Sequence, residues 1–162
     1  MRSKVYGVGN NDADYVLMIR EEKPRVNGKR TRGLVWECPF YQVWHNMLTR
    51  CYSESYQGRS PTYIGCFVCE EWLTFSNFKA WMMTQDWEGN QLDKDLLVEG
   101  NKKYSPQTCV FINNVVNTFI TNGKSSKKSE YPMGVSFHKK TQKLRVRCSN
   151  PVTGKIEYLG SC

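Results

Sequence analysis

The chain has 162 residues, of which 40% are hydrophobic and 13% aromatic, so it can bury a core and does not have the composition of a disordered chain. Its 23 lysines and arginines exceed its 15 acidic residues by eight, and this excess favours a polyanionic partner. No run of about 18 apolar residues could span a bilayer, and Met1–Lys4 lead into no apolar signal core, so we expect a cytoplasmic protein with no membrane partner.

Residues 1–37 form an N-terminal segment of strand and loop. The apolar run Tyr15–Ile19 predicts a strand, because it is rich in β-branched and aromatic residues and bounded by charged ones. Asn27-Gly28 marks a turn that fits a hairpin. We assign no chemistry to this segment.

Residues 38–123 form the next predicted domain, which begins with two helices. Apolar residues recur at intervals of three and four over Phe40–Tyr52, which predicts an amphipathic helix with Pro39 in its first turn. A second helical pattern runs over Trp72–Met82, with Thr74 or Ser76 as its cap. Its aromatic side chains could stack on bases, but aromatics at helical spacing are typical of a core, so both helices are interpreted as scaffold.

The cysteine pattern leaves two interpretations open. Cys66-Phe67-Val68-Cys69 has the spacing of half a zinc site, which Cys38, Cys51, Cys109 or His45 could complete in space. The alternative, which we favour, is a buried apolar pair. The chain has seven cysteines, an odd number, and no export signal, so we expect reduced thiols, most of them buried.

Residues 91–123 predict a compact ββα unit. The strands are Leu92–Val98 and Thr108–Ile112, joined by a turn-rich loop at residues 100–106. A helix follows at Val115–Ile120, with Asn113-Asn114 as its cap.

A basic linker at residues 124–130 separates this unit from a tail, residues 131–162. Three short strands are predicted in the tail, at Gly134–His138, Leu144–Ser149 and Ile156–Leu159, with turns between them. In the middle strand the side chains of Arg145 and Arg147 share one face, because side chains alternate along a strand. The fold class is therefore α+β, with a small antiparallel sheet after the helical core.

Charge is concentrated around this tail. Residues 124–147 hold eight basic residues and one acidic residue, which is the pattern of a surface that binds a polyanion. The alternative is a tail that serves only solubility.

Several motifs together resemble phage proteins related to HNH homing endonucleases, which carry a DNA-binding domain of the plant ethylene-response (Apetala) type. The resemblance covers most of residues 38–160. It rests on Tyr41-Gln42-Val43-Trp44-His45-Asn46-Met47-Leu48-Thr49-Arg50-Cys51-Tyr52, Cys69-Glu70-Glu71-Trp72-Leu73, Phe75-Ser76-Asn77-Phe78, Leu92-Asp93-Lys94-Asp95-Leu96-Leu97, Gly100-Asn101-Lys102, Tyr104-Ser105-Pro106-Gln107-Thr108-Cys109-Val110-Phe111, Asn117 and Gly134-Val135-Ser136-Phe137.

The HNH resemblance implies a site for one divalent metal, magnesium or manganese, that assists cleavage of DNA. It implies Asp93 or Asp95 as the carboxylate ligand and Asn117 as the ligand from the helix. The position of the catalytic base His is occupied by Lys94, and a lysine is normally protonated at neutral pH and cannot accept a proton. His45 could reach the site as a substitute base, or it could be a structural histidine in the first helix.

The resemblance of the tail implies that its sheet enters the major groove of double-stranded DNA. Arg145 and Arg147 match the outward positions of its middle strand, from which that domain type contacts bases and phosphates. From the charge of the tail we also expect contacts with DNA from His138, Lys139, Lys140 and Lys143. The covering helix of that domain type is missing here. The predicted apolar face of the sheet consists of Val135, Phe137, Leu144, Val146, Ile156 and Tyr158. We therefore expect this face to pack on the core, on a second subunit in a homodimer, or on a partner.

The combined expectation is a phage DNA-binding protein of the HNH endonuclease-like family, acting in the host cytoplasm. Three hypotheses remain at this stage: a metal-dependent nuclease, a DNA-binding protein of the same fold whose cleavage is weak or lost, and a protein that binds and inhibits a host protein.

Overall fold

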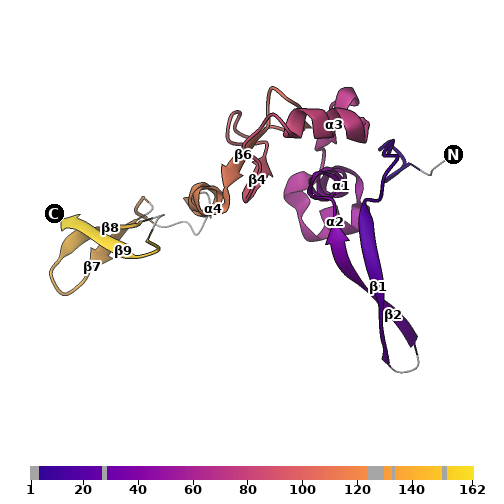
Figure 1. The fold of residues 1–162 in the computed structure, drawn as a ribbon. Helices are drawn as coiled ribbons and strands as arrows, with labels where there is room; N and C mark the ends of the chain where they lie inside the picture. The colour runs from indigo at the N-terminus through magenta and orange to yellow at the C-terminus, as the bar shows by residue number, and fades with distance from the viewer. Residues whose placement is uncertain (1–3, 27–28, 124–129, 133, 151–152) are drawn as a thin grey trace. The chain divides into compact units, whose positions relative to one another are not determined.

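The computed structural model describes residues 4–26, 29–123, 130–132, 134–150 and 153–162 (Figure 1). The chain contains both helices and strands, which agrees with the predicted α+β class. The chain divides into two compact units: a first unit of Met1–Glu88 and Leu92–Phe111, and a second unit of Gly89–Gln91 and Ile112–Cys162. Of the predicted linker, residues 124–129 lie outside the described residues.

The N-terminal part of the first unit contains a hairpin. The strands β1 (Met18–Val26) and β2 (Lys29–Glu37) pair antiparallel, which confirms a hairpin around Asn27-Gly28, two residues outside the described part of the chain. The strand begins at Met18 and not at Tyr15 as predicted. No bounds were predicted for the second strand, because Lys29–Gly33 has no apolar alternation.

The predicted first helix is confirmed as α1 (Pro39–Tyr52), with Pro39 at its first position. It is followed by α2 (Glu54–Arg59), where the Ser53 hydroxyl accepts a hydrogen bond from the backbone N–H of Tyr56, and by the 3₁₀ turn η1 (Pro61–Tyr63). Within the described ranges, no helix combines the length and the apolar character needed to cross a bilayer.

The predicted second helix is divided into two elements. Glu70–Leu73 form the 3₁₀ turn η2, and the α-helix α3 begins only at Phe75 and ends at Met82. Thr74 occupies the cap position, but its side chain makes no capping hydrogen bond. The cap comes from a distant part of the chain, since Oδ1 of Asp12 accepts a 3.0 Å hydrogen bond from the backbone N–H of Ser76.

The core of the first unit lies around α1, η2 and α3. The indole Nε1 of Trp44 donates a 2.7 Å hydrogen bond to the backbone oxygen of Trp72, which satisfies both groups in apolar surroundings. These aromatics are therefore scaffold, as predicted. The largest side chains that the core buries completely, or almost so, are aromatic or apolar: Trp44, Met47, Leu48, Trp72, Phe75, Phe78, Met82 and Tyr104.

Four short strands form two small two-stranded sheets. The short strands β3 (Phe67–Val68) and β5 (Lys103–Tyr104) pair in parallel, and β4 (Asn90–Asp93) pairs with β6 (Val110–Asn113). The helix α4 (Asn114–Gly123) follows, and Oδ1 of Asn113 accepts a hydrogen bond from the N–H of Val115, as the predicted cap requires. Strand β4, strand β6 and helix α4 follow in the predicted order, but the first strand ends at Asp93 and not at Val98. The predicted loop at residues 100–106 contains the short strand β5.

The tail forms the predicted three-stranded antiparallel sheet. Its strands are β7 (Val135–His138), β8 (Lys143–Ser149) and β9 (Ile156–Ser161), and β8 pairs with both of the others. The predicted strands are confirmed to within two residues at each end.

All seven cysteines are unpaired and four of them are buried, which confirms the expectation of free, mostly buried thiols. Burial raises the pKa of Cys51 to about 12 and that of Cys109 to about 11. Both thiols therefore remain protonated at neutral pH. Cys162 is the one cysteine of the seven that is exposed.

We predict that these thiols differ sharply in reactivity. At pH 8 the native protein should react rapidly with Ellman's reagent at Cys162 and slowly at the half-buried Cys69 and Cys148. Cys38, Cys51, Cys66 and Cys109 should react only after unfolding in guanidinium, because the reagent cannot reach them. Rapid reaction of more than three thiols in the native protein would contradict this core.

Candidate nucleic-acid interface

The excess positive charge of the chain lies almost entirely in the second unit. That unit holds nine basic and two acidic residues, for a net charge of +7, whereas the first unit holds 14 basic and 13 acidic residues. Since the whole chain carries +8, the second unit is the polyanion-binding candidate.

The central strand β8 presents its three cations on one face. Lys143, Arg145 and Arg147 alternate with apolar residues, so their side chains leave the sheet on the same side, about 6.8 Å apart along the strand. On β7, Ser136 lies opposite Arg145 and His138 lies opposite Lys143, which places both on this side as well.

A β-bulge in β9 determines what lies on the other side of β8. Gly160 lies opposite Val146. The next pair is Tyr158 opposite Arg147, so Leu159 is the additional residue of the bulge. Because opposed residues share a face of the sheet, Tyr158 lies beside Arg147. Its side chain is 58% exposed, so the ring is available to a ligand.

The prediction that Ile156 and Tyr158 belong to the apolar face is therefore wrong. One inserted residue reverses the alternation of side chains along β9. Ile156, opposite Ser149, therefore lies with Tyr158 on the face of Arg147. Gly160 has a φ of +142°, a conformation that other residues rarely adopt, which accounts for glycine at the bulge.

We call this surface the basic face. Among the described residues it carries no acidic side chain, because Glu157 lies opposite Cys148 on the other face. The basic face consists of Ser136, His138, Lys143, Arg145, Arg147, Ser149, Ile156, Tyr158 and Ser161.

The opposite face of the sheet is apolar and only partly covered. Val135, Leu144 and Val146 are half-buried, and Phe137 is 41% exposed. Gly134 precedes β7 with a φ of +81°, and its Cα lies so close to the backbone oxygen of Arg147 that a Cβ would collide with it. Gly134 therefore fixes the approach of β7 to β8.

The turn between β7 and β8 extends the row of cations. Lys139 and Lys140 are exposed in this turn. Nδ1 of His138 lies 2.9 Å from the hydroxyl of Thr141, and the side chain of Gln142 donates to the backbone oxygen of Lys139. The predicted DNA-binding residues are thus brought together on the basic face and in its adjoining turn.

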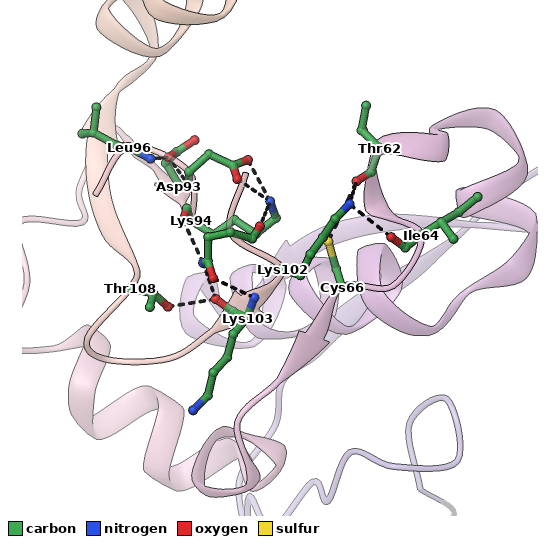
Figure 2. Close-up of polar contacts among 11 residues, drawn as sticks. Thr62, Ile64, Cys66, Asp93, Lys94, Leu96, Lys102, Lys103 and Thr108 are labelled. Carbon is green, nitrogen blue, oxygen red and sulfur yellow. Dashed lines mark hydrogen bonds and ion pairs between the residues drawn. The ribbon is translucent and has the colours of Figure 1, made fainter. Parts of the chain in front are cut away.

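The predicted catalytic residue Lys94 is buried in the loop after β4 (Figure 2). Its Nζ donates to both carboxylate oxygens of Asp95 at 2.7 Å and to the backbone oxygen of Asn101 at 2.6 Å. Three acceptors satisfy the three N–H donors of a charged ammonium, and a nitrogen in that state has no lone pair to accept a proton. These hydrogen bonds favour a structural role for Lys94 (Figure 2). The catalytic role of Lys94 stays a prediction.

The side chain of Asn101 also stabilises this loop through hydrogen bonds. Its Nδ2 donates to the backbone oxygens of Lys94 and Lys103, and its Oδ1 accepts from the N–H of Lys103. Lys102 fastens the loop to the segment after α2, because its Nζ donates to the backbone oxygens of Thr62 and Ile64. Asn101 therefore bonds to backbone groups of the loop itself, whereas Lys102 bonds to backbone outside it (Figure 2).

The predicted metal ligands have protein partners. Oδ1 of Asp93 accepts from the backbone N–H groups of Asp95 and Leu96, an Asx turn that begins the loop. In the second unit, the side chain of Asn117 donates to Oε1 of Gln91. No group of three or more His, Cys, Asp or Glu side chains is placed to hold a metal ion in the part of the chain that the structure describes.

The predicted substitute base, His45, lies half-buried on α1. Its ring contacts those of Tyr6 and Tyr41, with centroids 5.6 and 5.8 Å away, and Nδ1 lies 3.5 Å from the hydroxyl of Thr49. This environment accounts for a structural histidine. The Cys66 thiol, from the predicted half zinc site, contacts the backbone oxygen of Thr62.

Comparison with protein-family models, with curated proteins and with solved structures found no match to this chain.

Sequence reasoning gave Asn101 no structural role and assigned Tyr158 to the wrong face of the sheet. For Asn101 a signal was present, because an asparagine after glycine in a turn often bonds to nearby backbone. For Tyr158 the only signal was the neighbouring Gly160, which is too general to indicate a bulge.

We predict that Asn101→Ala destabilises the protein by about 2 to 4 kcal/mol, because it leaves several backbone groups of the loop without partners. Thermal unfolding followed by circular dichroism measures the change. Asn101→Asp should recover part of the loss, since it keeps an acceptor for the Lys103 N–H. An unchanged melting temperature for Asn101→Ala would show that these hydrogen bonds contribute little.

Proposed function

We propose that this chain is a DNA-binding protein whose second unit grips the backbone of double-stranded DNA through the basic face of β7, β8 and β9. The observation that carries the proposal is the row of Lys143, Arg145 and Arg147 on one face, with no acidic side chain among the face's described residues. Neutralising phosphates releases condensed counterions, which is the main source of affinity for such surfaces.

Double-stranded DNA fits this surface better than double-stranded RNA. The major groove of B-DNA is about 12 Å wide and admits a small β-ribbon or sheet, whereas the major groove of A-form RNA is too deep and narrow for side chains to read. Arginines suit this role because a guanidinium donates two parallel hydrogen bonds to a phosphate or a guanine. Tyr158 beside Arg147 adds an exposed aromatic ring at the same contact.

Cleavage is not part of this proposal. Lys94 donates all its hydrogens to protein acceptors, and the Asp93 and Asp95 carboxylates accept hydrogen bonds within their own loop. These residues support an ordered loop, and a binding function requires nothing further of them.

We predict that Arg145→Ala with Arg147→Ala weakens binding to a labelled DNA duplex and reduces its salt dependence. With about five phosphate contacts, the slope of log K against log salt is expected near −4 to −5. Removing two contacts should bring it to about −3. Fluorescence anisotropy over a series of salt concentrations measures both quantities.

Two variants serve as controls for this experiment. Lys4→Gln with Arg59→Gln removes the same charge from exposed positions of the first unit and should leave the slope unchanged. Arg145→Lys with Arg147→Lys should restore the slope but not the full affinity, because lysine keeps the charge and lacks the bidentate geometry. Equal binding by the wild type and the double alanine variant at matched salt would refute the proposal.

A further inference from the structure

The β1–β2 hairpin is built differently at its two ends. Its strands contact each other far more than they contact any helix, and Figure 1 shows them extending from α1 as a two-stranded ribbon. The half next to the helices exposes apolar side chains, namely Met18, Ile19, Leu34, Val35 and Trp36. The far half, residues 22–32, has five basic residues and one acidic residue, Glu22, which lies opposite Arg32.

This charge is segregated from the rest of the first unit. Without residues 22–32, the first unit has nine basic and 12 acidic residues, a net charge of −3. The far half of the hairpin is therefore basic, whereas the remainder of the first unit is acidic. Its positive potential is local and attracts a polyanion to the ribbon and not to the body.

The register distributes the described cations over both faces of the ribbon. Lys23 lies opposite Thr31, and its side chain crosses over Gly33, which has no Cβ to obstruct it. Arg32 lies opposite Glu22 on the other face, and their side chains form an exposed pair at 3.9 Å. An exposed pair of that length is weak, so Arg32 remains available to a stronger anion.

We propose that the far half of this hairpin is a second contact with the phosphate backbone of DNA, an arm that lies along the groove while the basic face holds the duplex elsewhere. This inference rests on the proposed function. A two-stranded ribbon fits the major groove, and the four or five residues that each strand contributes to the far half extend about 15 Å, close to half a turn of the duplex. A ribbon with cations on both faces meets the backbones on both sides of the groove.

The test is Lys23→Gln with Arg32→Gln, compared with the wild type on the same labelled duplex. The variant should bind at least about tenfold more weakly at low salt, with a slope less steep by up to about 2, since each lost phosphate contact removes about 0.9. The control Lys4→Gln with Arg59→Gln removes two charges from the first unit outside the arm and should bind as the wild type does.

A second variant keeps the test decisive if the first one folds poorly. Glu21→Gln with Glu22→Gln removes two negative charges from the same strand and should tighten binding, because repulsion from phosphates is relieved. Unchanged affinity in this variant, or a Lys23–Arg32 variant that is folded and binds like the control, overturns the arm.

The outcomes also separate this inference from the proposed function. If the Arg145–Arg147 variant loses affinity and the Lys23–Arg32 variant does not, the arm is rejected and the basic face stands. If the wild type does not bind duplex DNA at low salt, both fail together.

Discussion

The burial of Trp44 holds the first unit together. Its ring packs against Tyr41 and Phe75, and its indole nitrogen donates to the backbone oxygen of Trp72. Gly9 passes so close that a Cβ there would lie 3.1 Å from the Trp44 ring. One side chain therefore connects the N-terminal segment, α1, η2 and α3, and the hairpin and the Lys94 loop both start from this scaffold.

The Lys94 loop is ordered by polar contacts and not by apolar burial. A buried ammonium is costly unless it is fully paired, and here Asp95 and the backbone of Asn101 provide its acceptors. Asn101 in turn bonds to backbone on both sides of the loop. Each member depends on the others, so this network specifies a single loop conformation.

Charge is divided in this protein between two basic surfaces and an acidic remainder. The basic face belongs to the second unit, and the far half of the hairpin belongs to the first. Under the proposed function, the remainder of the first unit is repelled by the phosphates that the two basic surfaces attract. Under the same proposal, each basic surface attracts DNA by its own positive potential, and salt screens this attraction.

The sequence by itself determined α1 and the three strands of the tail, because the spacing of apolar residues is a local property that needs no knowledge of the partner surface. It also indicated the cations of β8. Only the tertiary structure decided that Tyr158 shares their face, because a bulge reverses the alternation through pairing with another strand. It likewise decided the acceptors of Lys94 and the cap that Asp12 provides to α3. These contacts join residues that sequence periodicity does not relate, and their geometry exists only once the chain has folded.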